Sequence, residues 1–393
     1  MKEKGTNMMK LRECCCKFMA FALAAVLLTG CGPAAPDSQE PAPEEAAITV
    51  TDLAGREHRF SRPLQKVGVQ WSCAGGPCMT MSALLGDEIA DHLACIDDSP
   101  EKYRADMWNQ CIKDVPALGQ VPVIGSANEE LNLEGVLASG AEAFLCPLEL
   151  KTILDESVGP RLEAAGIPVI YVDFHQETIE NHTKSTLLLG TLFGKEERAQ
   201  ELVDFYVDHR QAVTNRVEQL LKTRPRPSVY LEVGMMGPSE FGNSFDNHYS
   251  WGGIAYLSGA SSIGDGVVPK LGPLDSEYVL SCDPDRIVFT GAWGNAVPDA
   301  IRMGYGAEEK DTRERMEGFF TRPGWEELKA YREGQVFAIN HGMARELYDC
   351  ACFEFFAKLC FPEEFRDADP QKTLETYFER FMPYTLEGLW FVD

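Results

Sequence analysis

Short apolar runs alternate with amphipathic stretches along most of this chain. Residues 48–60 alternate between apolar and polar positions around a turn, which predicts a β-hairpin. The later runs that we interpret as strands are residues 66–71, 92–96, 143–146, 168–172, 228–233, 286–290 and 335–339. Helical patterns such as 79–85 and 129–139 separate them. Such alternation is typical of mainly parallel sheets built from βα units, so the pattern predicts an α/β fold.

One helical pattern, over residues 195–223, is much longer than the others. Its apolar positions near helical spacing are Ala199, Leu202, Tyr206, Val213, Val217 and Leu220. Two prolines at 225 and 227 follow and would end the helix. At about 1.5 Å per residue it would be roughly 40 Å long. We therefore predict two Rossmann-like lobes, residues 48–194 and 224–393, joined by one rigid helix with a ligand cleft between them.

The N-terminus has the pattern of an export signal. Five basic residues precede or enter an apolar run from Phe18 to Leu28, which is too short to span a bilayer. The run ends in Leu28-Thr29-Gly30-Cys31, which resembles the bacterial lipobox. We predict that residues 1–30 are removed and that Cys31 carries a lipid, which anchors the protein to the cell membrane outside the cytoplasm. The alternatives are an ordinary signal peptide with a chance Cys, or a short anchor helix.

The composition predicts a flexible tether and argues against nucleic acid as a partner. Residues 32–47 are rich in Pro, Ala and acids, which predicts a flexible tether. The formal net charge is −25, and it becomes −28 without the first 30 residues, which hold five bases and two acids. So acidic a protein is not expected to bind nucleic acid. The negative net charge is compatible with an anionic small ligand, because an Arg beside the ligand can outweigh the field of distant acids, which salt screens.

Thirteen cysteines are present, and nine remain after Cys14, Cys15, Cys16 and Cys31 are set aside. An odd number leaves at least one thiol unpaired in a monomer. Disulfides or free thiols are both open at this point. A zinc site is the third reading, but Cys73-x4-Cys78 and Cys350-x-Cys352 lack a second pair at finger spacing.

Both halves contain a short helix-like element with one acid near its start that leads into a strand. These elements are NLEGVL, with Glu134, and DSEYVL, with Glu277. Either acid alone is explained by the helix dipole, which favours a carboxylate in the first turn. Their matched positions in the two halves indicate a common role.

Several segments, in this order behind the lipobox, resemble the bacterial periplasmic and lipoprotein solute-binding proteins for iron-siderophore, haem and cobalamin uptake. The segments are residues 48–60, 66–71, 132–137, 164–173, 187–206, 275–280 and 324–342. The resemblance implies two α/β lobes joined by one helix, and an ABC permease as partner. It also implies that a Glu at the mouth of each lobe pairs with Arg residues of the transmembrane subunits. Glu134 and Glu277 match that pattern.

Ligands of doubly wound lobes bind beyond the carboxyl ends of the strands. The candidate ligand-binding residues there are Trp71, Pro77, Cys78, His175, Met235, Tyr249, Trp251, Trp293, His341 and Arg345. Arg345 can clasp a carboxylate, a catecholate or a haem propionate, and its alternative is a solvated charge at a helix start. His341 is either an iron ligand, a hydrogen-bond donor or structural.

Two loops bear on this site. Residues 241–253, which include Tyr249 and Trp251, are rich in Gly and Asn and predict a loop. Residues 72–76 depart from the family pattern, and their two glycines predict a pliable loop.

The predicted function is therefore a substrate-binding lipoprotein of an ABC importer, monomeric and without a resident cofactor, that captures a ferric siderophore or similar iron complex. A haem- or corrinoid-binding protein of the same class is the alternative, with His175 and His341 as the residues of interest. A surface or sensory lipoprotein that kept only the fold is another. Nucleophile elbows, zincin motifs and phosphate-binding loops are absent from the sequence, so we expect no enzyme. The rigid helix predicts only small closure of the lobes.

Overall fold

The computed structural model describes residues 48–393 except 74, 127–130 and 293–296. Residues 45–393 form one compact unit. The predicted signal segment, lipidated Cys31, the tether and Trp293 lie outside the described residues. No helix of the described part is long and apolar enough to cross a membrane.

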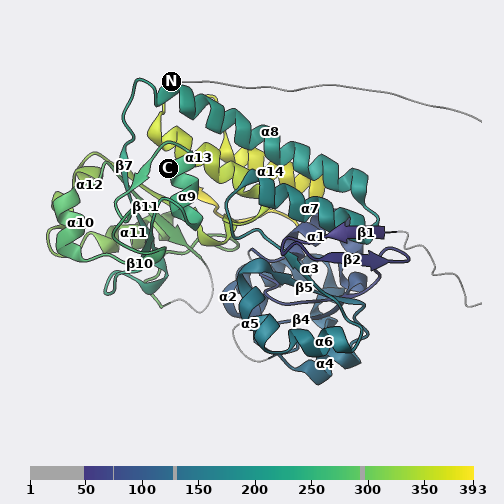
Figure 1. Cartoon of the computed structure of the whole chain (residues 1–393). Helices are drawn as coiled ribbons and strands as arrows, with labels where there is room; N and C mark the ends of the chain where they lie inside the picture. Colours follow the sequence, from purple (N-terminus) through teal and green to yellow (C-terminus); the bar gives the residue numbers. More distant parts are fainter. Residues whose placement is uncertain (1–47, 74, 127–130, 293–296) are drawn as a thin grey trace, which may run out of the picture. The chain divides into compact units, whose positions relative to one another are not determined.

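The first lobe opens with an antiparallel hairpin and continues with a parallel sheet (Figure 1). The hairpin strands are β1 (Ile48–Thr51) and β2 (Glu57–Phe60). The sheet has the order β4-β3-β5-β6 and consists of β3 (Val67–Val69), β4 (Leu93–Ile96), β5 (Ala143–Pro147) and β6 (Val169–Val172). All neighbouring strands in this sheet are parallel, and their side chains are buried.

The second lobe contains a five-stranded sheet of order β13-β12-β11-β7-β9. Its strands are β7 (Ser228–Val233), β9 (Ser261–Ser262), β11 (Arg286–Gly291), β12 (Val336–Asn340) and β13 (Phe391–Val392). All pairs are parallel except β12 with β13. A separate antiparallel pair joins β8 (Asn243–Phe245) to β10 (Leu271–Pro273). The predicted α/β fold with two mainly parallel sheets is confirmed.

Helices cover both sheets. Those of the first lobe are α1 (Cys78–Leu85), α2 (Ser99–Tyr103), α3 (Ala105–Asp114), α4 (Leu133–Ala138), α5 (Lys151–Glu156), α6 (Gly159–Ala164) and α7 (Ile179–Phe193). Those that follow the central helix are α9 (Ser250–Leu257), α10 (Ser276–Cys282), α11 (Glu309–Phe319), α12 (Lys329–Arg332), α13 (Cys350–Cys360) and α14 (Pro370–Phe381). Short 3₁₀ helices are η1 (Gly86–His92), η2 (Pro116–Gln120), η3 (Leu148–Leu150), η4 (Gly234–Met236), η5 (Trp325–Glu327), η6 (His341–Met343) and η7 (Leu347–Asp349).

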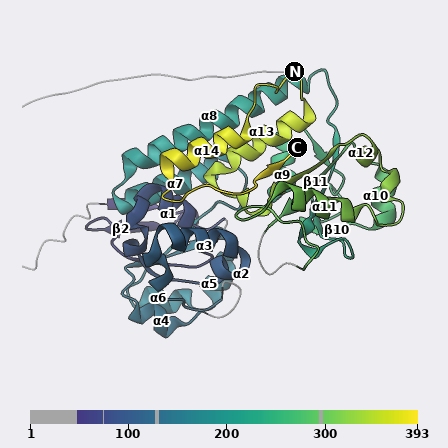
Figure 2. The ribbon, with the colours of Figure 1, turned by 180° about the vertical axis from the view of Figure 1, so that it is seen from behind.

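The predicted long helix is α8 (Glu196–Leu220), with 25 residues. At 1.5 Å per residue it is about 38 Å long. It begins directly after α7, and the two helices pack closely where a Cβ on Gly190 would come within 2.4 Å of the Ala199 Cβ. Figures 1 and 2 both show α13 and α14 running beside α8. The helix therefore packs against α7, which precedes it, and against α13 near the C-terminus.

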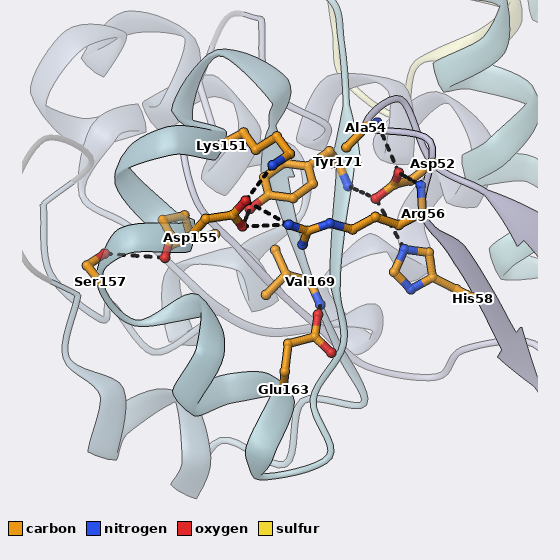
Figure 3. A network of polar contacts seen from close by, with 11 residues as sticks. Asp52, Ala54, Arg56, His58, Lys151, Asp155, Ser157, Glu163, Val169 and Tyr171 are labelled. Carbon is orange, nitrogen blue, oxygen red and sulfur yellow. Dashed lines mark hydrogen bonds and ion pairs between the residues drawn. The ribbon is translucent and has the colours of Figure 1, made fainter.

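A polar network fixes the N-terminal hairpin to the first lobe (Figure 3). Asp155 of α5 accepts hydrogen bonds from Arg56 at 2.7 and 2.8 Å, from Lys151 at 2.5 Å and from the Tyr171 hydroxyl at 2.7 Å. The carboxylate of Asp52 accepts from the Arg56 backbone N–H at 2.8 Å and from the Tyr171 N–H at 3.2 Å. The turn of the hairpin is thus held to β6 and α5.

Candidate functional site

Two bulky residues adopt a left-handed backbone directly after strands of the two lobes. Trp71, just after β3, has φ 55°, and Arg345, shortly after β12, has φ 70°. Ser250 and Asp283 are the other non-glycine residues with positive φ in the described part of the chain. This conformation costs roughly 1–3 kcal/mol per residue, and such residues cluster at functional sites. Both strained positions lie where the fold predicts a ligand.

The segments that follow these two strands contact one another. The backbone N–H of Gly75 donates to Glu346 Oε1 at 3.3 Å, and Arg104 Nη1 donates to the carbonyl of Gly342 at 2.7 Å. A Cβ on Gly342 would come within 2.0 Å of Arg104 Cζ, so the approach requires a glycine. Loops of both lobes therefore meet at one place.

An aromatic surface is built around Trp71. Its backbone N–H donates to Asp97 Oδ2 at 2.5 Å, which fixes the turn. Its ring stacks on Tyr103, with ring centroids 5.9 Å apart and planes at 27°, and lies 6.2 Å from the ring of His175. Tyr103 is 42% exposed, so this surface is open to solvent at one side. Aromatic faces of this kind suit a flat or chelated ligand.

Arg345 provides the positive charge at this junction. Burial, followed by the charge of Arg345, lowers the pKa of His175 to about 3. The same two causes, in the same order, lower the pKa of His341 to about 3. Both imidazoles are therefore neutral at physiological pH. Burial, followed by the charge of Glu149, raises the pKa of Tyr249, while the charge of Arg345 opposes this rise.

Three acids close to Arg345 are deeply buried, and burial shifts the pKa of each upward. Burial raises the pKa of Glu346 and of Glu177 well above the usual range, and raises that of Asp349 to about 7. The charge of Asp349 raises the pKa of Glu177 further. Because Glu177 and Glu346 hold their protons, they do not compensate the positive charge of Arg345, so the junction favours an anion although the whole chain is acidic.

Glu177, Asp349 and His182 form one group of potential metal ligands, whose donor atoms all lie within 4.8 Å of one another. The imidazole of His182 is, however, already engaged. Its Nε2 donates to the carbonyl of Phe174 at 3.0 Å, so Nδ1 must be the acceptor from the Tyr206 hydroxyl at 2.7 Å. With the imidazole engaged, the group offers only the two carboxyls, whose oxygens have no hydrogen-bond partner among the described residues.

Five residues predicted from the sequence are brought together here, namely Trp71, His175, Tyr249, His341 and Arg345. The Nδ1 of His341 is hydrogen-bonded to the Thr290 hydroxyl at 2.8 Å. Met235 lies in η4 after β7 and is partly buried.

Other predicted positions differ from expectation. The loop predicted over residues 241–253 is wrong, because β8 occupies its start and α9 begins at Ser250. Trp251 therefore lies on a helix and is fully buried, 6.3 Å from the ring of His341, so it packs behind the junction. Pro77 is buried, and Cys78 begins α1 and faces an internal cavity of the first lobe.

Arg104, Tyr103, Glu177, Glu346 and Asp349 were not predicted as site residues. Tyr103 and Arg104 lie where α2 meets α3, and Glu346 and Asp349 lie at η7. These elements are far apart in the sequence, and only the fold brings them to the junction. A weak sequence signal does exist, since Asp349 lies between Leu347-Tyr348 and Cys350-Ala351, which are not charged.

The two acids predicted to dock a permease are exposed. Glu134 lies in the first turn of α4, which leads into β5, and Glu277 lies in the first turn of α10, which leads into β11. A helix that precedes a parallel strand runs back across the sheet, so its first turn lies toward the carboxyl ends of the strands. Both acids thus belong to the same side of their sheets as the ligand loops.

A family model described as a periplasmic binding protein matches residues 156–341. No curated protein gives a match. The solved structure of the TroA-like periplasmic binding protein FepB from Veillonella parvula is 40% identical, with a TM-score of 0.85 over 88% of this chain and 99% of that chain.

Two more distant structures share the fold. A periplasmic heme binding protein from Pseudomonas aeruginosa is 19% identical, with a TM-score of 0.52 over 76% of this chain and 93% of that chain. A protein of an ABC-type Fe³⁺-hydroxamate transport system from Saccharomonospora viridis is 22% identical, with a TM-score of 0.52 over 79% of this chain and 98% of that chain. From the identity and coverage of the Veillonella structure, this chain belongs to the periplasmic binding proteins, the solute-binding family that works outside the cytoplasm with ABC permeases.

Proposed function

We propose that this chain is the lipid-anchored substrate-binding protein of an ABC importer and captures a ferric siderophore or a similar iron complex. The observation that carries this proposal is that Trp71 and Arg345, both in a left-handed backbone, lie in the two segments that meet at the junction of the lobes. Because Glu177 and Glu346 are protonated, the guanidinium is free to clasp an anionic chelate while the aromatic rings cover its flat surface. The Fe³⁺-hydroxamate relative adds support for an iron chelate.

The test is a titration of residues 32–393 followed by tryptophan fluorescence, with ferric hydroxamate, ferric catecholate, haem, cobinamide and bare Fe³⁺ as probes. A ferric chelate should quench the fluorescence and saturate. Arg345→Met should weaken its affinity at least tenfold, the effect of about 1.5–3 kcal/mol expected for a lost charged hydrogen bond. Arg332→Met, an exposed Arg of α12, is the matched control and should bind like the wild type. Unchanged affinity in Arg345→Met would contradict the proposal.

Haem is the second candidate, because His175 and His341 are both neutral and a neutral imidazole can bind iron. In that case haem, and not a ferric chelate, should bind with a shift of the Soret band. His175→Ala or His341→Ala should then abolish the shift. A ferric chelate that binds while haem leaves the spectrum unchanged would exclude this candidate.

Glu134 and Glu277 are proposed to dock the permease. Two exposed carboxylates on separate lobes offer bidentate partners for Arg, and two points fix an orientation that one point cannot. The double variant Glu134→Lys/Glu277→Lys should lose stimulation of the transporter ATPase and keep ligand affinity. Glu196→Lys, an exposed acid in the first turn of α8, is the control. Loss of ligand binding in the double variant would refute the assignment.

Cys31 is proposed as the lipid-bearing residue. Cys31→Ser should move the protein from the membrane fraction to the soluble fraction and abolish incorporation of labelled fatty acid. A Cys31→Ser protein that still carries the label would contradict the assignment.

A further inference from the structure

The first lobe and Tyr384, which follows α14, line a cavity of about 40 Å³ whose wall is rich in sulfur. Its sulfur-bearing residues are Cys73, Cys78, Cys111, Met79 and Met107. They come from the segment after β3, from α1 and from α3. Thiolates and thioethers are soft ligands, and they select soft metal ions over Mg²⁺ or Ca²⁺.

The three thiols of this cavity are free, and Cys73 and Cys111 are at most 7% exposed. Burial raises the pKa of Cys73 to about 11 and that of Cys111 to about 12. Burial also raises the pKa of Cys78 well above its usual value, and the charges of Cys73 and Cys111 add to this. All three thiols line the same cavity, and all three are protonated in the metal-free protein.

A buried cation faces the same cavity. Arg104 lines it and is only 7% exposed. Its Nη1 donates to the carbonyl of Gly342, but its Nη2 has no hydrogen-bond partner among the described residues. An unsatisfied guanidinium N–H at this depth is costly, and an anionic occupant would satisfy it.

We propose that this cavity binds one Cu⁺ ion through the thiolates of Cys78 and of either Cys73 or Cys111. Two thiols release their protons to solvent, two copper–sulfur bonds form, and copper remains Cu⁺ throughout. The resulting bis-thiolate complex carries one negative charge, which Arg104 neutralises. The iron-complex proposal rests on Trp71 and Arg345, which do not line this cavity, so the two proposals can fail separately.

The geometry favours Cu⁺ over Zn²⁺. Among the described side chains, the three thiols of the cavity do not all lie within 4.8 Å of one another, and the group of three ligand atoms that does consists of Glu177, His182 and Asp349. Structural Zn²⁺ requires four ligands in a tetrahedron, whereas Cu⁺ accepts two thiolates. Since Cys73 follows Trp71 by two positions, an occupied site would also anchor the segment that carries Trp71.

The experiment uses reduced, anaerobic protein comprising residues 32–393, because Cys14, Cys15, Cys16 and Cys31 would bind copper themselves and residues 45–393 form their own compact unit. Cu⁺ is supplied as its bicinchoninate complex. The wild type should withdraw one Cu⁺ per chain and release two protons. X-ray absorption of the loaded wild type should show sulfur neighbours, and oxygen or nitrogen neighbours alone would overturn the proposal.

Variants identify the ligands. Cys78→Ser and Cys78→Ala should both lose the withdrawal of Cu⁺, while Cys360→Ser, a buried thiol of α13 outside the cavity, should keep it. One of Cys73→Ser and Cys111→Ser should show the same loss, and circular dichroism checks that each variant is folded. The proposal would be overturned if both Cys78 variants retained Cu⁺, or if Cys73→Ser and Cys111→Ser both retained it. A wild type that, offered both ions, bound Zn²⁺ in preference to Cu⁺ would also overturn it.

Discussion

Replacing Asp349 with Asn should change how the stability of the protein depends on pH. The Asp349 side chain is fully buried, and burial raises its pKa from 3.8 to about 7, while the charge of Arg210 opposes this rise. In the unfolded chain the same carboxyl loses its proton near pH 4. Between these two values the folded protein holds a proton that the unfolded chain has released, so its stability falls as pH rises.

The magnitude follows from linkage. One proton held only by the folded state contributes about 1.4 kcal/mol for each pH unit. Between pH 5 and the folded pKa of about 7, the stability that Asp349 contributes therefore falls by about 3 kcal/mol. Below pH 4 this contribution is fully present, and above pH 7 it is lost. Asn has a similar shape but no titrating proton, so the variant lacks this dependence.

The assay is urea unfolding at pH 5 and pH 8, with the free energy of unfolding extrapolated to water. The wild type should lose about 3 kcal/mol more than Asp349→Asn between the two pH values. Asp208→Asn, an exposed acid of α8, is the control and should follow the wild type. If Asp349→Asn lost as much free energy as the wild type, the carboxyl would be ionised in the folded protein and the charge balance argued for the junction would fail.

Three further changes test other parts of the structure. Arg322→Met removes the partner of the fully buried Glu232, bonded at 2.8 and 2.9 Å, and should lower the free energy of unfolding by about 3–5 kcal/mol in urea titrations. Although desolvation opposes it, hydrogen bonds lower the pKa of Asp155 to about 2, so the stability it contributes is present above pH 4 and lost toward pH 2. Asp155→Asn should make acid unfolding less steep, and an unchanged acid profile would contradict this. Gly342→Ala must displace Arg104 and should lower the melting temperature, whereas an unchanged melting curve would show that the two loops are not in contact.

The strands of the two main sheets were predictable because parallel strands are buried on both faces and form continuous apolar runs. β5, with all five residues buried, is such a run. β13 was not predicted, because two residues near the C-terminus carry no local signal and become a strand only by pairing with β12. The resemblance to solute-binding proteins that the sequence indicated is confirmed by the family match and by the Veillonella structure.

The wrong loop around Trp251 has a specific physical cause. Its glycines were taken as a sign of flexibility, yet a Cβ on Gly252 would come within 1.7 Å of the Asp246 carbonyl oxygen. Gly252 is thus required by the close approach of α9 to the segment before it. Composition alone cannot separate a glycine that permits flexibility from one that permits close packing.

The site residues comprise those that the chain order predicts and those that depend on contacts between the lobes. Trp71 and Arg345 were found because residues just past parallel strands line the ligand side of the fold, a rule that needs only the chain order. Arg104 and Glu346 were missed because each acquires its role from the opposite lobe, through Gly342 and Gly75. The net charge of the chain does not predict the local charge of the site, because burial changes the charge of an acid and the sequence does not reveal burial.

Limited closure of the lobes stays a prediction, and the structure supplies a second reason for it beyond α8. The chain after α14 returns to the first lobe before it enters the second sheet as β13. There the Tyr384 hydroxyl is hydrogen-bonded to Ser82 at 2.8 Å, and the Thr385 N–H donates to Asp114 at 2.7 Å. A large closure would have to break these bonds as well as bend a 25-residue helix packed along α13. The lobes are therefore joined at two places, and rigid joining favours small adjustments of the loops around Trp71 and Arg345 over a hinge motion.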